Sequence, residues 1–268
     1  MQVLQALRSR LAQRRHVDPR PGLREQLVVP LDAADPRPSR LNDRRFDGQI
    51  SGRDGLFPPG LALRVLGEGG GLPKIRAFVP ADGRAPLELL LQVNGIMTDV
   101  ALHNANLQDI ADRTGCAVVG IHNATTHDMV LDVSECVQNK LDRNDAMPAV
   151  HTLAALTLDA LDDRLPVRLL GHSQGALVLE GTLQRVIAVR LAHHRGLGLT
   201  PAQADLAVLR DLKLISVETW GGASHCFSGG TTADLHLVNV FDLVARLLGV
   251  GSGKRTGGRN GEHGSDQD

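Results

Sequence analysis

The pentapeptide GHSQG (residues 171–175) is the stretch whose residue types and spacing are best suited to chemistry. It follows the apolar run VRLL (167–170) and precedes apolar residues at steps of three and four, so we expect a strand to end and a helix to begin here. A serine on such a sharp turn exposes its hydroxyl above the sheet, and the flanking glycines let strand and helix approach closely. The pattern predicts that Ser173 is a nucleophile; the alternative is a tight turn without chemistry.

The residue after the serine adds a second feature. The backbone N–H of Gln174 lies at the start of the expected helix, where the helix dipole adds partial positive charge. An N–H group in that place can stabilise the negative charge that develops on a substrate oxygen during acyl transfer. The sequence therefore predicts that Gln174 is an oxyanion donor.

Composition excludes several classes of partner. The 29 basic and 30 acidic residues leave a formal charge of -1, so we expect neither nucleic acid nor an anionic membrane surface as a partner. No stretch approaches the length of a membrane-spanning helix, and the Arg-rich N-terminus lacks the apolar core of a secretory signal. The 3 cysteines show no zinc-like or disulfide spacing. We expect a cytoplasmic protein without stable membrane insertion; a transit peptide is the alternative for the N-terminus.

Regular elements must position these residues. The short runs LALRVL (61–66) and KIRAFV (74–79) predict an antiparallel hairpin. Further strands are expected at LELLLQV (87–93), CAVVGI (116–121), VRLL (167–170), KLISVETW (213–220) and LHLVN (235–239), with helices at 100–113, 147–162, after Gly175 and after Thr200. Thr200 and Gln203 have the spacing of a capping box.

Strands that alternate with helices predict an α/β fold of three layers, with a mostly parallel sheet and helices on both faces. The early hairpin adds an antiparallel edge. The GHSQG turn then lies at the carboxyl end of a central strand, where open α/β sheets bind their ligands.

The sequence resembles the α/β-hydrolase superfamily over roughly residues 56–250. The resemblance rests on GHSQGA (171–176), VNGIMTD (93–99), GIHNATTHD (120–128) and VETWGGAS (217–224) with LVNVFD (237–242). Within the superfamily the chain is most similar to a poorly characterised group of bacterial lipase- and esterase-like serine hydrolases. The resemblance implies a catalytic triad and an oxyanion hole with two donors.

The loop after the third strand supplies the second oxyanion donor in this superfamily. Here that loop is VNGIMTD, in which Gly95 permits close approach of the backbone. The N–H of Ile96 is the first candidate and that of Met97 the second, and Asn94 is expected to brace the loop through its amide. The alternative is a structural turn without chemistry.

The remaining triad members follow the serine in the order acid, then histidine, in this superfamily. Asp242, just beyond the last expected strand, is the predicted acid, with Asp234 and Glu218 as rivals. His263 is the predicted base because no other histidine follows Asp242. His225 is the runner-up, because His263 lies in a Gly-rich, charged tail of disordered composition.

The long connection 122–148 is the expected cap over the pocket, with His122, Asn123 and Thr125 as the residues expected to line it. The spacing of its histidines and acids matches no familiar metal site, so we expect no metal and no cofactor. His172 is expected to point away from the site and to pack.

These inferences divide the chain into an N-terminal extension (1–55), an α/β-hydrolase domain (56–250) and a Gly-rich tail (251–268). The predicted function is a serine hydrolase that cleaves an acyl ester or lipid through an acyl-enzyme on Ser173. The alternative is an α/β-hydrolase-like protein of weak or no activity, without a complete triad, that binds a small ligand or a partner. The sequence leaves open the acyl chain, ester or thioester specificity, the role of residues 1–55 and the oligomeric state.

Overall fold

The computed structural model describes residues 46–57, 75–125, 147–222, 224 and 231–237. These residues form a seven-stranded mixed sheet with the strand order β2-β1-β4-β3-β5-β6-β7. The strands are β1 (Ile50–Gly52), β2 (Gly55–Phe57), β3 (Leu89–Val93), β4 (Ala117–Ile121), β5 (Val167–His172), β6 (Ile215–Trp220) and β7 (Ala233–Leu237). The strands from β4 to β7 along the sheet are parallel, and β1 is antiparallel to both its neighbours. The predicted α/β class is confirmed.

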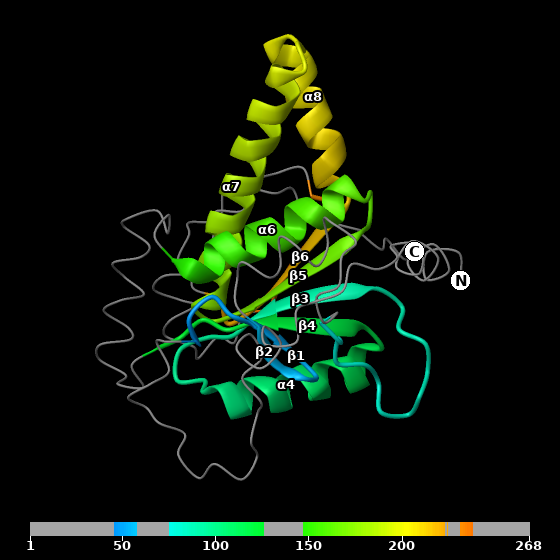
Figure 1. The fold of residues 1–268 in the computed structure, drawn as a ribbon, viewed down its shortest axis with the longest axis vertical. Coiled ribbons are helices and arrows are strands. Elements are labelled where there is room, and N and C mark those ends of the chain that lie inside the picture. The colour runs from blue at the N-terminus through cyan, green and yellow to red at the C-terminus, as the bar shows by residue number, and fades with distance from the viewer. Residues whose placement is uncertain (1–45, 58–74, 126–146, 223, 225–230, 238–268) are drawn as a thin grey trace, which may run out of the picture.

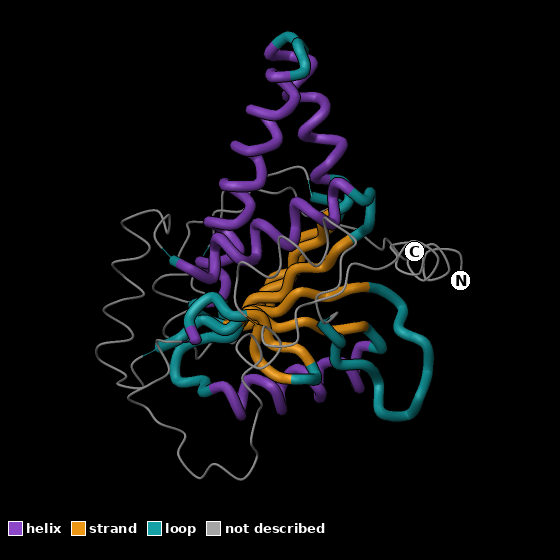
Figure 2. Tube along the Cα trace, viewed as in Figure 1, coloured by secondary structure: helices purple, strands orange, loops and turns teal. Residues whose placement is uncertain are grey.

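Helices cover both faces of this sheet (Figure 1, Figure 2). Helices α6 (Pro148–Asp162) and α7 (Gly175–Gly196) pack on one face, and α4 (Val100–Thr114) packs on the other. One apolar core fills the space toward α6 and α7, and a smaller core around Leu90, Leu107 and Val118 lies beneath α4. The three layers follow from strands that are apolar on both faces and helices that are apolar on one.

The direction in which the chain crosses the sheet changes at β3. From β3 the chain passes through α4 to β4 on one side, and later returns through α6 to β5 on the other side. The loops that follow β3 and β5 therefore run apart at the carboxyl edge of the sheet. In open α/β sheets the crevice at such a switch point is where ligands bind.

Helix α8 (Pro201–Leu212) and the distal part of α7 form a hairpin that projects beyond the sheet (Figure 1). The predicted capping box is confirmed, because the Thr200 side chain accepts from the Gln203 N–H and the Gln203 side chain accepts from the Thr200 N–H. At the other end of α8, the buried carboxylate of Asp211 contacts Arg164 at 3.0 Å and His194 at 3.1 Å. This carboxylate joins α8 to α7 and to the residues after α6.

The antiparallel hairpin lies earlier in the chain than its predicted position. It pairs Ile50–Gly52 with Gly55–Phe57 across the turn Arg53-Asp54, and the predicted domain boundary at residue 55 falls within it. Of the predicted strand 74–79, the described residues form only an isolated bridge between Phe78 and Val118, whereas residues 61–66 lie outside the described part of the chain. The displacement has a physical reason: Ile50, Leu56 and Phe57 are at most 1% exposed and complete the core at this edge.

Candidate active site

The turn between β5 and α7 holds Ser173 in a conformation that non-glycine residues rarely adopt. Its φ is +51°, which is in the left-handed region and costs backbone energy. The turn is fixed on both sides: the Ser173 N–H donates to Trp220 O at 2.9 Å, and Ser173 O accepts from the Ala176 N–H at 3.1 Å. The side chain is half-buried. The predicted strand, sharp turn and helix are confirmed.

Both flanking glycines are required by close packing. A Cβ on Gly171 would lie 2.9 Å from the backbone nitrogen of Ala176, and one on Gly175 would lie 2.5 Å from Val93 O. Contacts this short to backbone atoms cannot be relieved by a side-chain rotation. The glycines therefore let α7 begin directly against β3, with its N-terminus at the carboxyl edge of the sheet.

The loop after β3 lies against the serine, as the sequence led us to expect of a second oxyanion loop. A Cβ on Gly95 would lie 2.7 Å from Ser173 Cβ and 2.9 Å from His172 O. Of the two candidate donors in this loop, the Met97 N–H donates to Thr125 Oγ1 at 3.2 Å. The Ile96 N–H has no acceptor among the described residues, so it is the donor left open beside Ser173.

The N-terminus of α7 begins at the residue after Ser173 and has no side-chain cap. Gln174 is the N-cap residue, yet its side chain makes no capping hydrogen bond to the helix. Within the described part of the chain, no acceptor takes the Gln174 N–H. An uncapped helix N-terminus is a favourable place for negative charge. The two N–H groups that the sequence singled out, those of Ile96 and Gln174, thus have no acceptor within the described residues, and they lie on the loops that follow β3 and β5.

Three buried amides join the loops at the carboxyl edge of the sheet. Asn94, Asn123 and Gln174 follow β3, β4 and β5, and each is 2% exposed. Asn94 makes two hydrogen bonds of 2.8 Å with the Asn123 backbone, and Asn123 Nδ2 donates to Gln174 Oε1 at 2.8 Å. This geometry gives Asn94 the bracing contacts that were predicted from the sequence. The sequence named Asn123 only as a residue expected to line the pocket, and nothing in the sequence indicated its contact with Gln174.

His122 lies elsewhere than predicted. It is fully buried, and its Nδ1 is 3.4 Å from Nδ1 of His103 on α4, so its imidazole belongs to the layer between α4 and the sheet and does not line an open pocket. His103 Nε2 in turn contacts Gln92 Oε1 at 2.5 Å. Burial holds the pKa of His103 well below its usual value, and the neighbouring His122 adds to this effect.

His172 also differs from the expectation. We expected a packing residue, but its side chain is exposed, because the strand has already left the cover of α4 at this position. A Cβ on Gly95 would lie 3.0 Å from His172 Nδ1, so the imidazole lies over the loop after β3.

One further histidine lies near the carboxyl edge, on β7. His236 Nδ1 is 2.8 Å from Thr219 Oγ1, and burial lowers its pKa, although the carboxylate of Asp234 opposes the shift. In the sheet, β6 separates β7 from β5. The predicted acid and bases, Asp242, His263 and His225, lie outside the described residues, as does most of the expected cap at 122–148, from residue 126 to residue 146.

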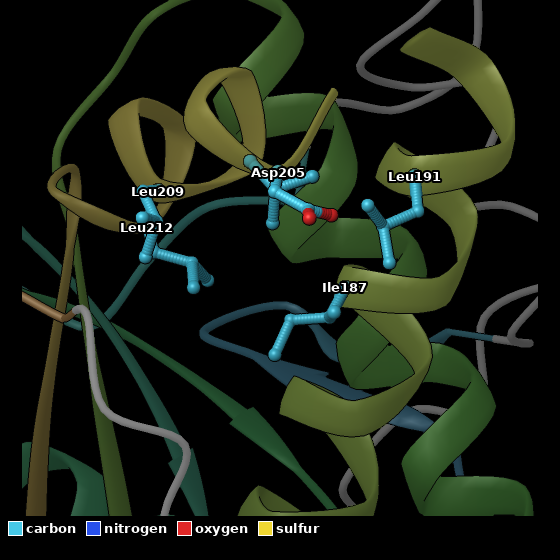
Figure 3. A pocket seen from close by; sticks show the side chains of 6 residues that line it. Ile187, Leu191, Asp205, Leu209 and Leu212 are labelled. Carbon is cyan, nitrogen blue, oxygen red and sulfur yellow. The ribbon is translucent and has the colours of Figure 1, made fainter. Parts of the chain in front are cut away.

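A separate hollow of about 270 Å³ lies between α7 and α8 (Figure 3). Its lining is mostly apolar and consists of Ile187, Leu191, Asp205, Val208, Leu209 and Leu212. None of these residues belongs to the loops around Ser173, so this hollow is separate from the Ser173 turn.

The described residues contain neither a cluster of metal-ligating side chains nor a membrane-spanning helix. No group of three or more metal-ligating side chains occurs in the ranges that the structure describes. No helix in those ranges is long and apolar enough to cross a membrane.

Comparisons with known proteins give little beyond this geometry. No protein-family model matches the chain. No curated protein matches it either. Among solved structures it is similar to a dienelactone hydrolase-like promiscuous phosphotriesterase from metagenomic libraries, with 11% identity and a TM-score of 0.34 over 61% of this chain. The match spans 62% of that protein's length. The functional proposal therefore rests on the sequence motifs and on the geometry around Ser173.

Proposed function

We propose that the chain is a serine hydrolase that cleaves an acyl ester through an acyl-enzyme on Ser173. The observation that supports this most directly is the φ of +51° at Ser173, on a turn between strand and helix with the Gly95 loop packed against it. Glycine would adopt this backbone conformation without strain, so a purely structural turn would favour glycine at this position. A nucleophile, in contrast, requires a serine whose hydroxyl is held above the sheet. Strain of this kind is typical of functional sites.

In the proposed reaction the Ser173 hydroxyl oxygen attacks the ester carbonyl carbon while a histidine accepts the hydroxyl proton. The carbonyl oxygen becomes an oxyanion, which accepts hydrogen bonds from the N–H groups of Gln174 and Ile96. The carbon–oxygen bond to the alcohol then breaks, and the alcohol leaves with the proton held by the histidine. Water then attacks the acyl carbon while the same histidine accepts a proton from it. The bond from the acyl carbon to Ser173 Oγ breaks, the histidine returns the proton to Oγ, and the carboxylic acid is released.

We assign the histidine to His263 and its carboxylate partner to Asp242, with His225 as the alternative base. The acid holds the imidazole in the tautomer that can accept the serine proton, and it stabilises the imidazolium that forms. The substrate is a small-molecule acyl ester or a lipid. No step of this reaction requires a metal or a cofactor.

The proposal is tested by turnover of a short-chain p-nitrophenyl ester. We expect Ser173→Ala to reduce kcat by at least about 10⁴-fold, because the acyl-enzyme cannot form. Ser216→Ala is the matched control, since Ser216 is a half-buried serine near the opposite end of the neighbouring strand β6. Equal turnover by wild type and Ser173→Ala would contradict the proposal, as would equal losses in the two variants.

A further inference from the structure

Three segments that are far apart in sequence meet at the carboxyl edge of the sheet through buried amides. Asn94 follows β3, Asn123 follows β4 and Gln174 ends the turn after β5, and all three are 2% exposed. A buried amide without partners costs free energy, so such groups persist where their hydrogen bonds are made. The partners of these amides therefore show what the cluster holds in place.

The first contact extends the pairing of β3 with β4. The last register pair of these strands is Val93 with Ile121. Asn94 is one residue beyond this pair and Asn123 is two residues beyond it. Asn94 Oδ1 accepts from the Asn123 N–H, and Asn94 Nδ2 donates to Asn123 O, both at 2.8 Å. The side chain of Asn94 thus makes the two bonds that a backbone would make in a ladder. This fixes the start of the oxyanion loop relative to β4.

The second contact reaches the nucleophile turn. Asn123 Nδ2 donates to Gln174 Oε1 at 2.8 Å. Gln174 is the N-cap residue of α7, and its side chain makes no capping hydrogen bond to the helix. The contact with Asn123 therefore ties the residue that begins α7, directly after Ser173, to the loop after β4.

The third contact comes from the same loop, two residues further on. Thr125 Oγ1 accepts from the Met97 N–H at 3.2 Å, and Met97 has a φ of +61°. This unusual backbone conformation immediately follows Ile96, whose N–H remains open. The loop 123–125 therefore contacts both sides of the crevice.

We infer that Asn123 is a positioning residue of the proposed hydrolase: it fixes Gln174 through its side chain and the oxyanion loop through its backbone, and so sets the separation of the two oxyanion donors. The inference rests on the proposed function. Asn123 does not touch the substrate; it acts through Gln174 and Asn94. Its removal should therefore weaken transition-state stabilisation more than ground-state binding.

The test is the inactivation of Ser173 by a fluorophosphonate, whose phosphoryl oxygen gains negative charge in the transition state as an ester oxygen does. The saturation curve separates the maximal rate of inactivation, kinact, from the concentration that gives half of it, KI. Asn123→Ala removes the bond to Gln174 but keeps both backbone bonds to Asn94. We expect kinact to fall by roughly 10-fold to 100-fold, as for a misplaced catalytic group, and KI to stay within about three-fold.

A double mutant tests whether Asn123 acts through Gln174. Gln174→Ala keeps the Gln174 backbone N–H but loses the same side-chain hydrogen bond. The double variant should lose no more of kinact than the more affected single variant, because both changes remove one interaction. Independent, additive losses would overturn the inference.

Asp211→Asn is the matched control for stability. Asp211 is a buried polar residue at the opposite edge of the sheet, where its carbonyl oxygen accepts from the Leu214 N–H just before β6. The six residues of β6 span about 16 Å, so we expect this variant to lower Tm without changing kinact. Should Asn123→Ala fail to fold, Gln174→Ala removes the same bond from its other end and must show the same fall in kinact.

The outcomes separate this inference from the proposed function. A wild-type protein that is not labelled at Ser173 would refute the proposed function and the inference with it. A labelled wild type with a folded Asn123→Ala variant that reacts at the same kinact would refute the inference alone. A fall in kinact with unchanged KI, absent in Asp211→Asn, would support it.

Discussion

Gly95 and Ser173 are in contact in a way that leaves no room for a side chain at position 95. A Cβ there would meet Ser173 Cβ at 2.7 Å and His172 O at 2.9 Å, and neither of these atoms can move without disturbing the turn. The added methyl group must therefore shift the loop that carries Ile96. Close approach of this loop to Ser173 is the reason for glycine at this position.

We expect Gly95→Ala to lower kcat for a short-chain ester by about 10²-fold or more, the usual effect of losing one oxyanion donor. Steady-state kinetics measures this. Gly196→Ala is the control, because a Cβ there meets nothing within 4 Å and the change improves helix propensity. If Gly95→Ala keeps activity within a factor of two of wild type, the loop after β3 has a structural role only.

The layer between α4 and the sheet contains a buried histidine, His103, whose charged form is disfavoured by burial. His103 Nε2 donates to Gln92 Oε1, so the other nitrogen of a neutral His103 is left to accept from His122 Nδ1. Burial and the neighbouring His122 keep the pKa of His103 well below 6.5. Protonation of this site would place an uncompensated charge in the core.

This arrangement predicts a dependence of stability on pH. In the unfolded chain His103 binds a proton near pH 6.5, whereas in the folded protein it does so only at lower pH. The contribution of neutral His103 is therefore complete above pH 6.5 and is lost as pH falls below it, by at most about 1.4 kcal/mol per pH unit. Thermal unfolding should show a Tm that drops between pH 7 and pH 5.

His103→Gln should reduce that drop, because glutamine does not titrate and can still donate to Gln92. His151→Gln serves as the control, since His151 is an exposed histidine on α6. Equal changes of Tm between pH 7 and pH 5 in wild type and His103→Gln would show that His103 is not responsible. Half-buried His236 contributes in the same direction, so some pH dependence should remain.

At the scale of the whole molecule, the sheet order brings together loops that the sequence separates. Asn94 and Asn123 are 29 residues apart, and Asn123 and Gln174 are 51 apart, yet they share hydrogen bonds because β4, β3 and β5 are adjacent. The crevice therefore depends on the order of the strands as well as on the GHSQG turn.

Most strands, the helices and the turn at Ser173 could be predicted from the sequence, because each depends on the pattern of apolar and small residues in a short segment. Apolar runs located strands β3 to β7, and the spacing of small residues around Ser173 located the turn. The first hairpin was missed because Ile50, Leu56 and Phe57 are embedded in a polar stretch and show too short a run to form a period. The place of His122 could not be predicted, because it depends on which face of β4 meets α4. The role inferred for Asn123 depends on two loops that only the fold brings near.

The triad is expected to be completed by the segments that follow β6 and β7. If His263 is the base, His263→Ala should lower kcat for ester hydrolysis by at least about 10³-fold, with the Tm unchanged because the Gly-rich tail has little apolar surface to bury. His225→Ala is the paired variant. Loss of turnover in His225→Ala, with full turnover in His263→Ala, would move the assignment to the loop after β6.

The central claim is that Ser173 is an activated nucleophile, and covalent labelling tests it most directly. Wild-type protein is treated with a fluorophosphonate, the intact mass is measured, and the modified peptide is sequenced by mass spectrometry. We expect a single phosphonyl adduct on Ser173, which is absent from Ser173→Ala and from heat-unfolded wild type. A folded wild-type protein without an adduct, or with an adduct on another residue only, would contradict the claim and leave an α/β scaffold without serine hydrolase chemistry.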